Sequence, residues 1–438
     1  MIQNLIQFLK DSPVNYLAIQ TLADRLDLMG FRHLDAGDRL EKLKAGDRVY
    51  FEKNGSALFA FEIGKKSLAD AGIRLICAHC DSPTFRLKPN PTMLNMRSGI
   101  AKLDVEVYGG VILNSWFDRP LSLAGRIILK TKDIMHPNVQ LIHIRRPLLT
   151  IPNLCIHLNR QVNDGLKISV QKEINPILGF IANTFEKEDI LMQILCDECP
   201  CSPDQILDFD LYLYDVTDPC LFGANNEFIS AGRLDDLSMV HAGLEAFLTC
   251  GCAPKTTRVL AVFDNEETGS QTKQGAASPF FASLVERLVA MQGGDREDYY
   301  RCIEHSFMIS ADNAHAYHPN YGEKYDPITA PVLGGGPVIK FNAAQKYASD
   351  AYSASIFAQI CTLADVPYQK FVNHSDVAGG STLGNILTSN FPVCGVDMGN
   401  PILAMHSVRE TGSVTDHDNC IKAFRTFYNI IETSSKQD

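Results

Sequence analysis

Apolar residues recur at helical spacing near the N-terminus, from Met1 to about Met29. Asp11-Ser12-Pro13 interrupts this pattern, which predicts two helices rather than one. Short apolar runs at 48–51, 57–61 and 73–78 then predict strands. The first part of the chain is therefore expected to combine helices with strands of a buried sheet.

The hydrophobic pattern changes between about Lys88 and Phe228, where apolar and polar residues alternate and Gly, Pro and Asn are frequent. The predicted strands are 103–108, 125–129, 139–144 and 209–214. Strict alternation is typical of antiparallel sheets with one face in water. We expect a β-rich unit here, with a helix near 177–195.

After Ser230 strands and helices alternate as far as the C-terminus. Helices are predicted at 237–248, 280–290, 351–364 and 418–431, and strands at 258–263, 307–311 and 393–398. Such alternation indicates a sheet covered on both faces by helices. The simplest interpretation is one α/β domain of residues 1–87 and 229–438, interrupted by an inserted β-rich domain of residues 88–228.

Length and charge narrow the class of protein. The 438 residues are enough for two domains, and the net charge of −11 argues against nucleic acid or an anionic membrane as the main partner. No apolar run approaches the roughly 18 residues of a membrane span, and the first ten residues do not resemble a secretory signal. A cytoplasmic location is expected.

The 13 cysteines are scattered except for one cluster of Cys196, Cys199 and Cys201. Two interpretations are open for this cluster, a small zinc or redox site and a set of free thiols. No second CxxC pair accompanies it, which favours free thiols in a reducing compartment.

The candidate chemistry lies where predicted strands end or a predicted helix begins. The residues are His79 and Asp81 after the strand at 73–78, Asp235 and Asp236 at the start of the helix at 237–248, Glu266 and Glu267 after the strand at 258–263, Asp312 after the strand at 307–311, and His406 after the strand at 393–398. Each has an ordinary interpretation alone, as a packed histidine, a helix cap or a turn residue. Together they are expected to converge beyond the carboxyl ends of one sheet.

Imidazole and carboxylate groups without thiolates suit a hydrolytic Zn, Mn or Co centre, and five ligands with one shared carboxylate are enough for two metals. Glu266 and Glu267 are costly at the end of a buried strand unless a cation neutralises them. Neighbours on an extended chain point in different directions, so one glutamate can bind metal while the other faces the attacking water.

Several longer motifs resemble those of one family, the M18 aminopeptidases. They are Ala78-His79-Cys80-Asp81-Ser82-Pro83, Trp116-Phe117-Asp118-Arg119, Ile151 to Leu158, Gly232-Arg233-Leu234-Asp235-Asp236, Asp264 to Ser270, Ala314-His315, His318-Pro319-Asn320-Tyr321, Gly336 to Lys340 and Met405 to Glu410. The resemblance runs over almost the whole chain. It implies a zinc-exopeptidase-type α/β sandwich with a central mixed sheet and an inserted β-rich dimerisation domain.

The resemblance also implies roles for single residues. Two zinc ions, with Mn²⁺ or Co²⁺ as substitutes, would be bridged by Asp235 and completed by His79, Glu267, Asp312 and His406, with the division between the metals left open. Glu266 would be the general base and Asp81 the carboxylate that orients His79. His315, Lys340 and Tyr347 would line the substrate pocket, and His157 would reach a neighbouring subunit's site.

The activity implied is removal of N-terminal residues from peptides with a free amino group, with a preference for acidic residues taken from aspartyl aminopeptidase. Dimers would assemble into tetrahedral dodecamers. The chain departs from the family at Ala378-Gly379, where Pro-Cys is common, and at Val14-Asn15-Tyr16-Leu17. The alternatives are another two-metal hydrolase of the M42 or M20 type, such as a carboxypeptidase or deacylase, and a non-catalytic scaffold.

Overall fold

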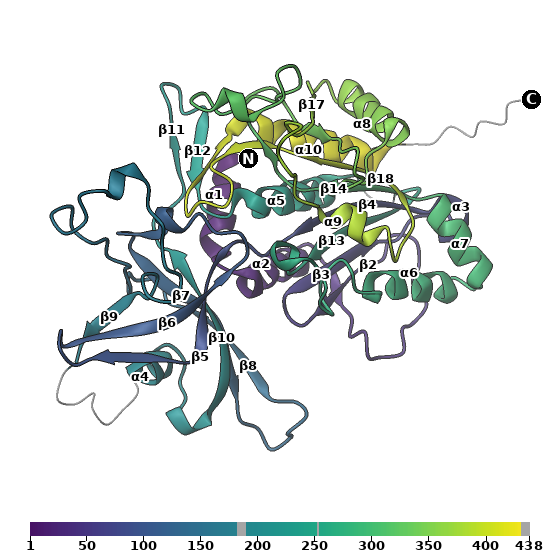
Figure 1. Ribbon diagram of the computed structural model, residues 1–438. Helices are drawn as coiled ribbons and strands as arrows, with labels where there is room; N and C mark the ends of the chain where they lie inside the picture. Colours follow the sequence, from purple (N-terminus) through teal and green to yellow (C-terminus); the bar gives the residue numbers. More distant parts are fainter. Residues whose placement is uncertain (182–189, 252–253, 431–438) are drawn as a thin grey trace, which may run out of the picture.

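The computed structural model describes residues 1–181, 190–251 and 254–430. Figure 1 shows an α/β part and a β-rich part that extends away from it. The α/β part is built on a nine-stranded sheet with the order β1-β2-β3-β13-β4-β14-β18-β16-β17. The bounds are β1 Arg32–His33, β2 Arg48–Lys53, β3 Ala57–Glu62, β13 Thr257–Phe263, β4 Ile73–His79, β14 Phe307–Ala311, β18 Cys394–Gly399, β16 Val338–Lys340 and β17 Gln369–Phe371.

The four central strands β13, β4, β14 and β18 run parallel, whereas β3 and β16 join them antiparallel. The predicted mixed sheet is therefore confirmed. His79 is the last residue of β4 and lies level with Phe263, the last residue of β13. Because parallel strands end at one edge, the residues that follow β13, β4 and β14 are brought together.

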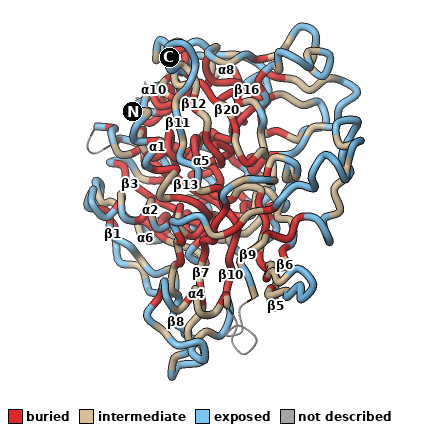
Figure 2. Tube along the Cα trace, turned by 90° about the vertical axis from the view of Figure 1, so that its left-hand side faces the viewer, coloured by how far each residue is buried: buried red, intermediate tan, exposed pale blue. Residues whose placement is uncertain are grey.

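Helices cover both faces of this sheet. One face carries α1 (Ile2–Asp11), α2 (Asn15–Leu28), α5 (Leu234–Thr249), α8 (Ala351–Leu363) and α10 (Val414–Asn429). The other face carries α3 (Leu68–Ala71), α6 (Phe280–Met291), α7 (Arg296–Glu304) and α9 (Leu383–Leu387). Each layer contributes apolar side chains to a separate core on its side of the sheet, and the buried part of the chain in Figure 2 includes the central strands.

The β-rich part contains a six-stranded antiparallel sheet with the order β8-β7-β10-β5-β6-β9. Its strands are β5 Thr84–Asn95, β6 Ile100–Tyr108, β7 Leu121–Leu129, β8 Asn138–His143, β9 Ile177–Phe180 and β10 Ile206–Asp215, and α4 (Ile190–Glu198) packs beside them. A smaller sheet has the order β11-β12-β20-β19-β15. It contains β11 Cys220–Phe222, β12 Phe228–Ala231, β20 Glu410–Ser413, β19 Pro401–Leu403 and β15 Ala314–His315.

The helix predicted near 177–195 is wrong in its first part, because Ile177–Phe180 forms strand β9. Ile177 exchanges main-chain hydrogen bonds with Thr150, and the strand pairs with β6. Periodicity cannot reveal such distant partners. The helix begins at Ile190, and residues 182–189 lie outside the described part of the chain. The closing helix begins at Val414, where the Ser413 side chain caps it, and the predicted end at Ile431 lies outside the described residues.

The division into residues 1–87 with 229–438 and residues 88–228 stays a proposal. The sheets favour slightly earlier boundaries, because β5 already begins at Thr84 and β10 ends at Asp215. β11 lies in the proposed insert, yet it pairs with β12 in the smaller sheet. Among the described residues, no helix combines the length and apolar character needed to cross a membrane.

Candidate metal centre

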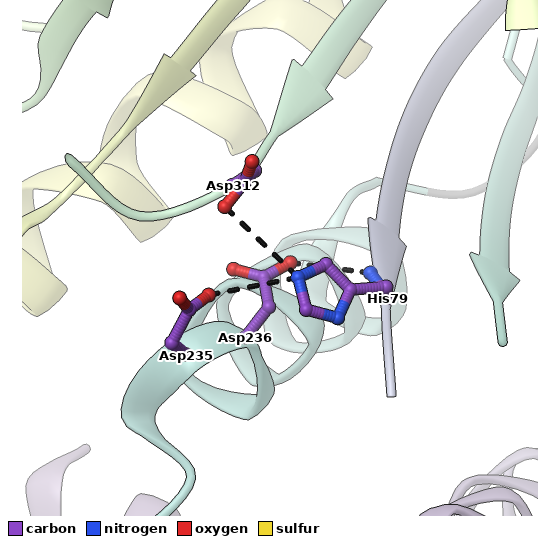
Figure 3. A group of neighbouring side chains, drawn as sticks. All are labelled: His79, Asp235, Asp236 and Asp312. Atoms are coloured by element: carbon purple, nitrogen blue, oxygen red, sulfur yellow. Dashed lines mark hydrogen bonds and ion pairs between the residues drawn. The ribbon is translucent and has the colours of Figure 1, made fainter. Parts of the chain in front are cut away.

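The candidate residues lie together at the carboxyl edge of the central strands. His79 ends β4, Asp312 follows β14, and Asp235 stands in the first turn of α5. Figure 3 shows one ring nitrogen of His79 facing both Asp235 and Asp312, while Asp236 faces the main-chain nitrogen of His79. Glu266 and Glu267 follow β13, and His406 reaches the same place from the loop after β19.

Three overlapping groups of these side chains can place one atom each within 4.8 Å of one another. They are His79 with Asp235, Asp236 and Asp312; His79 with Glu266 and Glu267; and Asp235 with Glu267 and His406. Asp235 belongs to a group with each histidine. The expected convergence of the sequence candidates is therefore present in the fold.

Both histidines present Nε2 to carboxylates. The Nδ1 of His79 lies 3.1 Å from the Asp81 carbonyl oxygen, and the Nδ1 of His406 lies 3.0 Å from the Gly110 carbonyl oxygen. With Nδ1 donating to these oxygens, Nε2 is left to bind a metal, which is the usual arrangement of ligand histidines. The Nε2 atoms lie 3.3–4.0 Å from oxygens of Asp235, Glu267 and Asp312, mostly longer than ordinary hydrogen bonds.

Two buried oxygens of the cluster, Oδ1 of Asp235 and Oε1 of Glu267, have no hydrogen-bond partner. Buried polar atoms without partners are costly, and hard carboxylate oxygens beside imidazole nitrogens suit a divalent ion such as zinc. The residues present therefore fit the implied metal.

The charges of the cluster act strongly on one another. Burial, together with the charges of Asp312 and Glu267, raises the pKa of Glu266 well above its ordinary value despite the opposing effect of His79. Burial is also the main cause that raises the pKa of Glu267 to about 7. Burial alone would raise the pKa of Asp235, but the neighbouring rings of His406 and His79 hold it below its usual range. Negative charge is in excess here, which favours cation binding.

Asp81 holds the turn that carries the two glutamates. Its carboxylate accepts hydrogen bonds from the main-chain N–H groups of Glu266 and Glu267, each at 3.1 Å, and its Oδ1 lies 3.4 Å from Nδ1 of His79. The expectation of an extended chain at Glu266 is wrong, because Asn265 has a left-handed φ of 61° and Glu266–Thr268 forms a short 3₁₀ turn. Asp81 stabilises this turn, because its one carboxylate accepts hydrogen bonds from two successive main-chain N–H groups.

Sequence reasoning named Glu410 and Asp236 within motifs but assigned neither of them a role. Glu410 is buried and accepts hydrogen bonds from the main-chain N–H groups of Asp235, at 3.1 Å, and His406, at 2.8 Å. Asp236 accepts a bond of 3.1 Å from the His79 main-chain N–H. Glu410 lies four residues after His406 in the sequence, and nothing in that spacing indicates its role.

Of the residues predicted to bind substrate, Lys340 and Tyr347 are buried, whereas His315 and His157 are exposed. Lys340 is buried, its Nζ lies 3.2 Å from Oδ2 of Asp312, and it faces the ring of Tyr347. His315 is exposed, and its ring packs edge-on against Phe371. His157 is exposed in the segment between β8 and β9, and no hydrogen bond or ion pair described for the chain joins it to the cluster.

Comparison with known proteins decides the family. The profile described as "Aminopeptidase I zinc metalloprotease (M18)" matches residues 8–428. The chain belongs to the M18 family. It is 50% identical over 428 residues to a Clostridium acetobutylicum protein named "Probable M18 family aminopeptidase 2", and the match covers 98% of both chains.

Solved structures of M18 proteins have the same fold. A chain of the structure described as "Cryo-EM structure of the Ape4 and Nbr1 complex" has a TM-score of 0.93 at 34% identity, with 98% of this chain and 87% of that chain covered. The S. cerevisiae mApe1 dodecamer has a TM-score of 0.84 at 25% identity, with 97% and 95% covered. These matches confirm the predicted family, α/β fold and enzyme class: the M18 protein is a metalloaminopeptidase. They favour M18 over the M42 and M20 alternatives.

The cysteine cluster is not part of this centre. Cys196, Cys199 and Cys201 are free thiols, and Sγ of Cys201 lies 3.8 Å from Sγ of Cys196. Burial raises the pKa of both Cys199 and Cys201, so neither is an activated thiolate.

Proposed function

We propose that this M18 protein is a co-catalytic di-zinc aminopeptidase that removes N-terminal residues from peptides. The observation that carries the proposal is the place of Asp235, which shares one group with His79 and Asp312 and another with Glu267 and His406. A carboxylate common to two ligand groups is what a bridged two-metal site requires.

Under this proposal His79 and Asp312 would hold one zinc, Glu267 and His406 would hold the other, and Asp235 would serve both. Bound zinc would acidify the attacking water and polarise the scissile carbonyl. Mn²⁺ and Co²⁺ are proposed as substitutes, because the same imidazole and carboxylate ligands accept them.

Glu266 is proposed as the general base. Its carboxylate takes a proton from the attacking water as the water oxygen bonds to the carbonyl carbon, and then gives that proton to the peptide nitrogen as the C–N bond breaks and the amine leaves. Lys340, paired with Asp312 beside the cluster, and His315 would face the developing negative charge on the carbonyl oxygen. Asp81 supports Glu266 by fixing its main-chain N–H.

The direct test is Glu266→Gln, which keeps the size of the side chain but cannot accept the proton. The turnover number should fall by at least a thousandfold while two zinc ions per chain remain bound, measured by peptide hydrolysis and metal analysis. Glu286→Gln, an exposed position on α6, is the matched control and should leave both values unchanged. Near-normal turnover in Glu266→Gln would show that another group is the base.

Substrates are proposed to be peptides with a free α-amino group and an acidic first residue. The positive charge of Lys340 supports an acidic preference, and its pairing with Asp312 weakens that support. A panel of Asp, Glu, Leu, Met and Lys aminoacyl substrates would rank the first residue. N-acetylated peptides should not be cleaved, and their cleavage would contradict the exopeptidase assignment.

A homo-oligomer built through the β-rich part is proposed as well, up to a dodecamer like that of mApe1. Leu154, Ile156, Leu158 and Phe180 are all exposed apolar residues of this part. Large apolar side chains exposed on a surface are typical of interfaces. His157 lies among them and is proposed to enter a neighbouring subunit's site. The cytoplasmic location stays a prediction.

A further inference from the structure

The β-rich part touches the metal cluster at the end of strand β6. Tyr108 closes this strand, and Gly109 and Gly110 follow it. A Cβ atom on Gly109 would lie 3.1 Å from Cβ of Glu267, and one on Gly110 would lie 3.2 Å from Nδ1 of His406. The same segment accepts the Nδ1 contact of His406 through the Gly110 carbonyl oxygen at 3.0 Å. Residues 108–110 are therefore part of the wall of the cluster.

Tyr108 makes the most specific of these contacts. Its hydroxyl group donates to Oδ2 of Asp81 at 2.7 Å and accepts from Nδ2 of Asn265 at 2.8 Å. Asn265 is held in turn, because its Oδ1 accepts hydrogen bonds of 2.8 Å from Thr272 and Gln274. The hydroxyl group thus joins the carboxylate behind His79 to the turn that begins at Asn265.

Asp81 is a shared support, because it faces the His79 ring and accepts the N–H groups of Glu266 and Glu267. A change in its orientation would move a ligand candidate and the candidate base together. Groups that orient metal ligands through hydrogen bonds typically change metal affinity or activity by 10–100-fold when removed.

We infer that Tyr108 is a positioning residue, through which the β-rich part fixes Asp81 and so the arrangement of His79 and the Glu266–Glu267 turn. This inference rests on the proposed function for its catalytic consequence, whereas its consequence for zinc binding does not need turnover. The β-rich part then has a role within each subunit, separate from assembly.

The experiment compares Tyr108→Phe with Tyr212→Phe in the full-length protein. Tyr212 packs edge-on against Tyr108 with ring centroids 5.7 Å apart, so both variants lose one hydroxyl group from the same aromatic pair. Zinc dissociation constants are measured by competition with a chelator, and kcat and KM by peptide hydrolysis. Melting temperatures establish that both variants are folded.

Tyr108→Phe should weaken zinc binding by about 10-fold and lower kcat by about 10-fold, with KM within about twofold of the unchanged protein. Tyr212→Phe should leave all three values within about twofold. If zinc affinity and kcat are unchanged in Tyr108→Phe, the inference is overturned. Tyr108 and Asp81 line a cavity of about 40 Å³, which has room for a water molecule in place of the hydroxyl group, so the experiment is a real test of the hydroxyl group. Equal losses in both variants would assign the effect to ring packing and overturn the inference too.

The two proposals fail separately. If the unchanged protein cleaves no peptide, the proposed function is wrong, and the zinc titrations still decide the role of Tyr108. If the protein cleaves peptides and Tyr108→Phe behaves normally, only the inference about Tyr108 is wrong.

Discussion

Single residues of the cluster depend on partners that are distant in the sequence. The Nδ1 of His406 meets the carbonyl oxygen of Gly110, and the main-chain N–H of His79 meets Asp236. The sequence predicted which imidazoles and carboxylates would gather, because each follows a strand or begins a helix. It could not predict Tyr108 or the role of Glu410, because their importance lies in hydrogen bonds that only the finished fold creates.

Glu410→Gln tests one such residue. The glutamate accepts two main-chain N–H groups, and an amide can accept only through its one oxygen while its NH₂ group would face an N–H donor. We expect zinc affinity to fall by about 10-fold, measured by chelator competition. Glu227→Gln, in the loop before β12, serves as the comparison, and equal affinities in both variants would show that Glu410 does not hold the ligands.

At the scale of elements, helices with a clear apolar stripe and strands of the central sheet were predictable from the sequence. Strand β9 was mistaken for helix, and α7, whose sequence is mostly polar, was not predicted. The short strands β15 and β19 were missed because two or three residues carry too little pattern. Tertiary pairing decides these segments more than local preference.

Helices α5 and α10 meet through a buried pair of histidines, whose atoms Nδ1 of His241 and Nε2 of His417 lie 3.0 Å apart. Burial lowers the pKa of both rings, to about 3 for His417, and the positive amino terminus acts in the same direction. The positive charges of His417 and Arg25 lower the pKa of His241 further. One carboxylate also faces this ring, because Oε1 of Glu245 lies 3.5 Å from Nε2 of His241.

The unfolded chain therefore takes up protons on these rings first, since an unperturbed histidine has a pKa of about 6.5. The stability that these two neutral histidines contribute is complete above pH ~6.5 and should be lost as the pH falls toward their pKa values in the folded chain. In His417→Gln the free energy of unfolding should depend less steeply on pH between about 4 and 6.5, by up to about 1.4 kcal/mol per pH unit.

Denaturant titrations in chelator, which keep metal release out of the comparison, would measure these slopes. The exposed His33→Gln is the control and should keep the slope of the unchanged protein. An unaltered slope in His417→Gln would mean that the buried pair does not set the acid sensitivity.

At the scale of the whole molecule, an inserted β-rich part and an α/β part were both predictable, since the hydrophobic period changes along the chain. Their mutual contacts were not, because residues 108–110 meet the cluster through the tertiary fold alone. Oligomerisation stays a proposal, and it can be tested on the whole molecule, as can the effect of zinc on stability.

The oligomer should dissociate when its apolar surface is charged. We expect Leu158→Asp combined with Phe180→Asp to give smaller species in light scattering, since both side chains are at least 75% exposed in the single chain. Ile134→Asp, at a still more exposed position in the β7–β8 turn, should not change the size. If neither change alters the size, the interface lies elsewhere.

Zinc should stabilise the folded chain, because its ligands come together only there. Removal with a chelator should abolish peptide hydrolysis and lower the melting temperature, and added zinc should restore both. Differential scanning fluorimetry over a range of zinc concentrations would show the shift. A melting temperature independent of zinc would contradict binding at a site assembled by the fold.

The cluster draws on β4, α5, β13, β14 and the loop that ends in Glu410, so its parts are spread over more than three hundred residues. During synthesis on the ribosome, the growing chain carries His79 long before His406 exists. A nascent chain therefore has no complete set of ligands and should not hydrolyse the peptides around it. The order of the residues makes peptidase activity a property that the chain acquires only after its synthesis has passed His406.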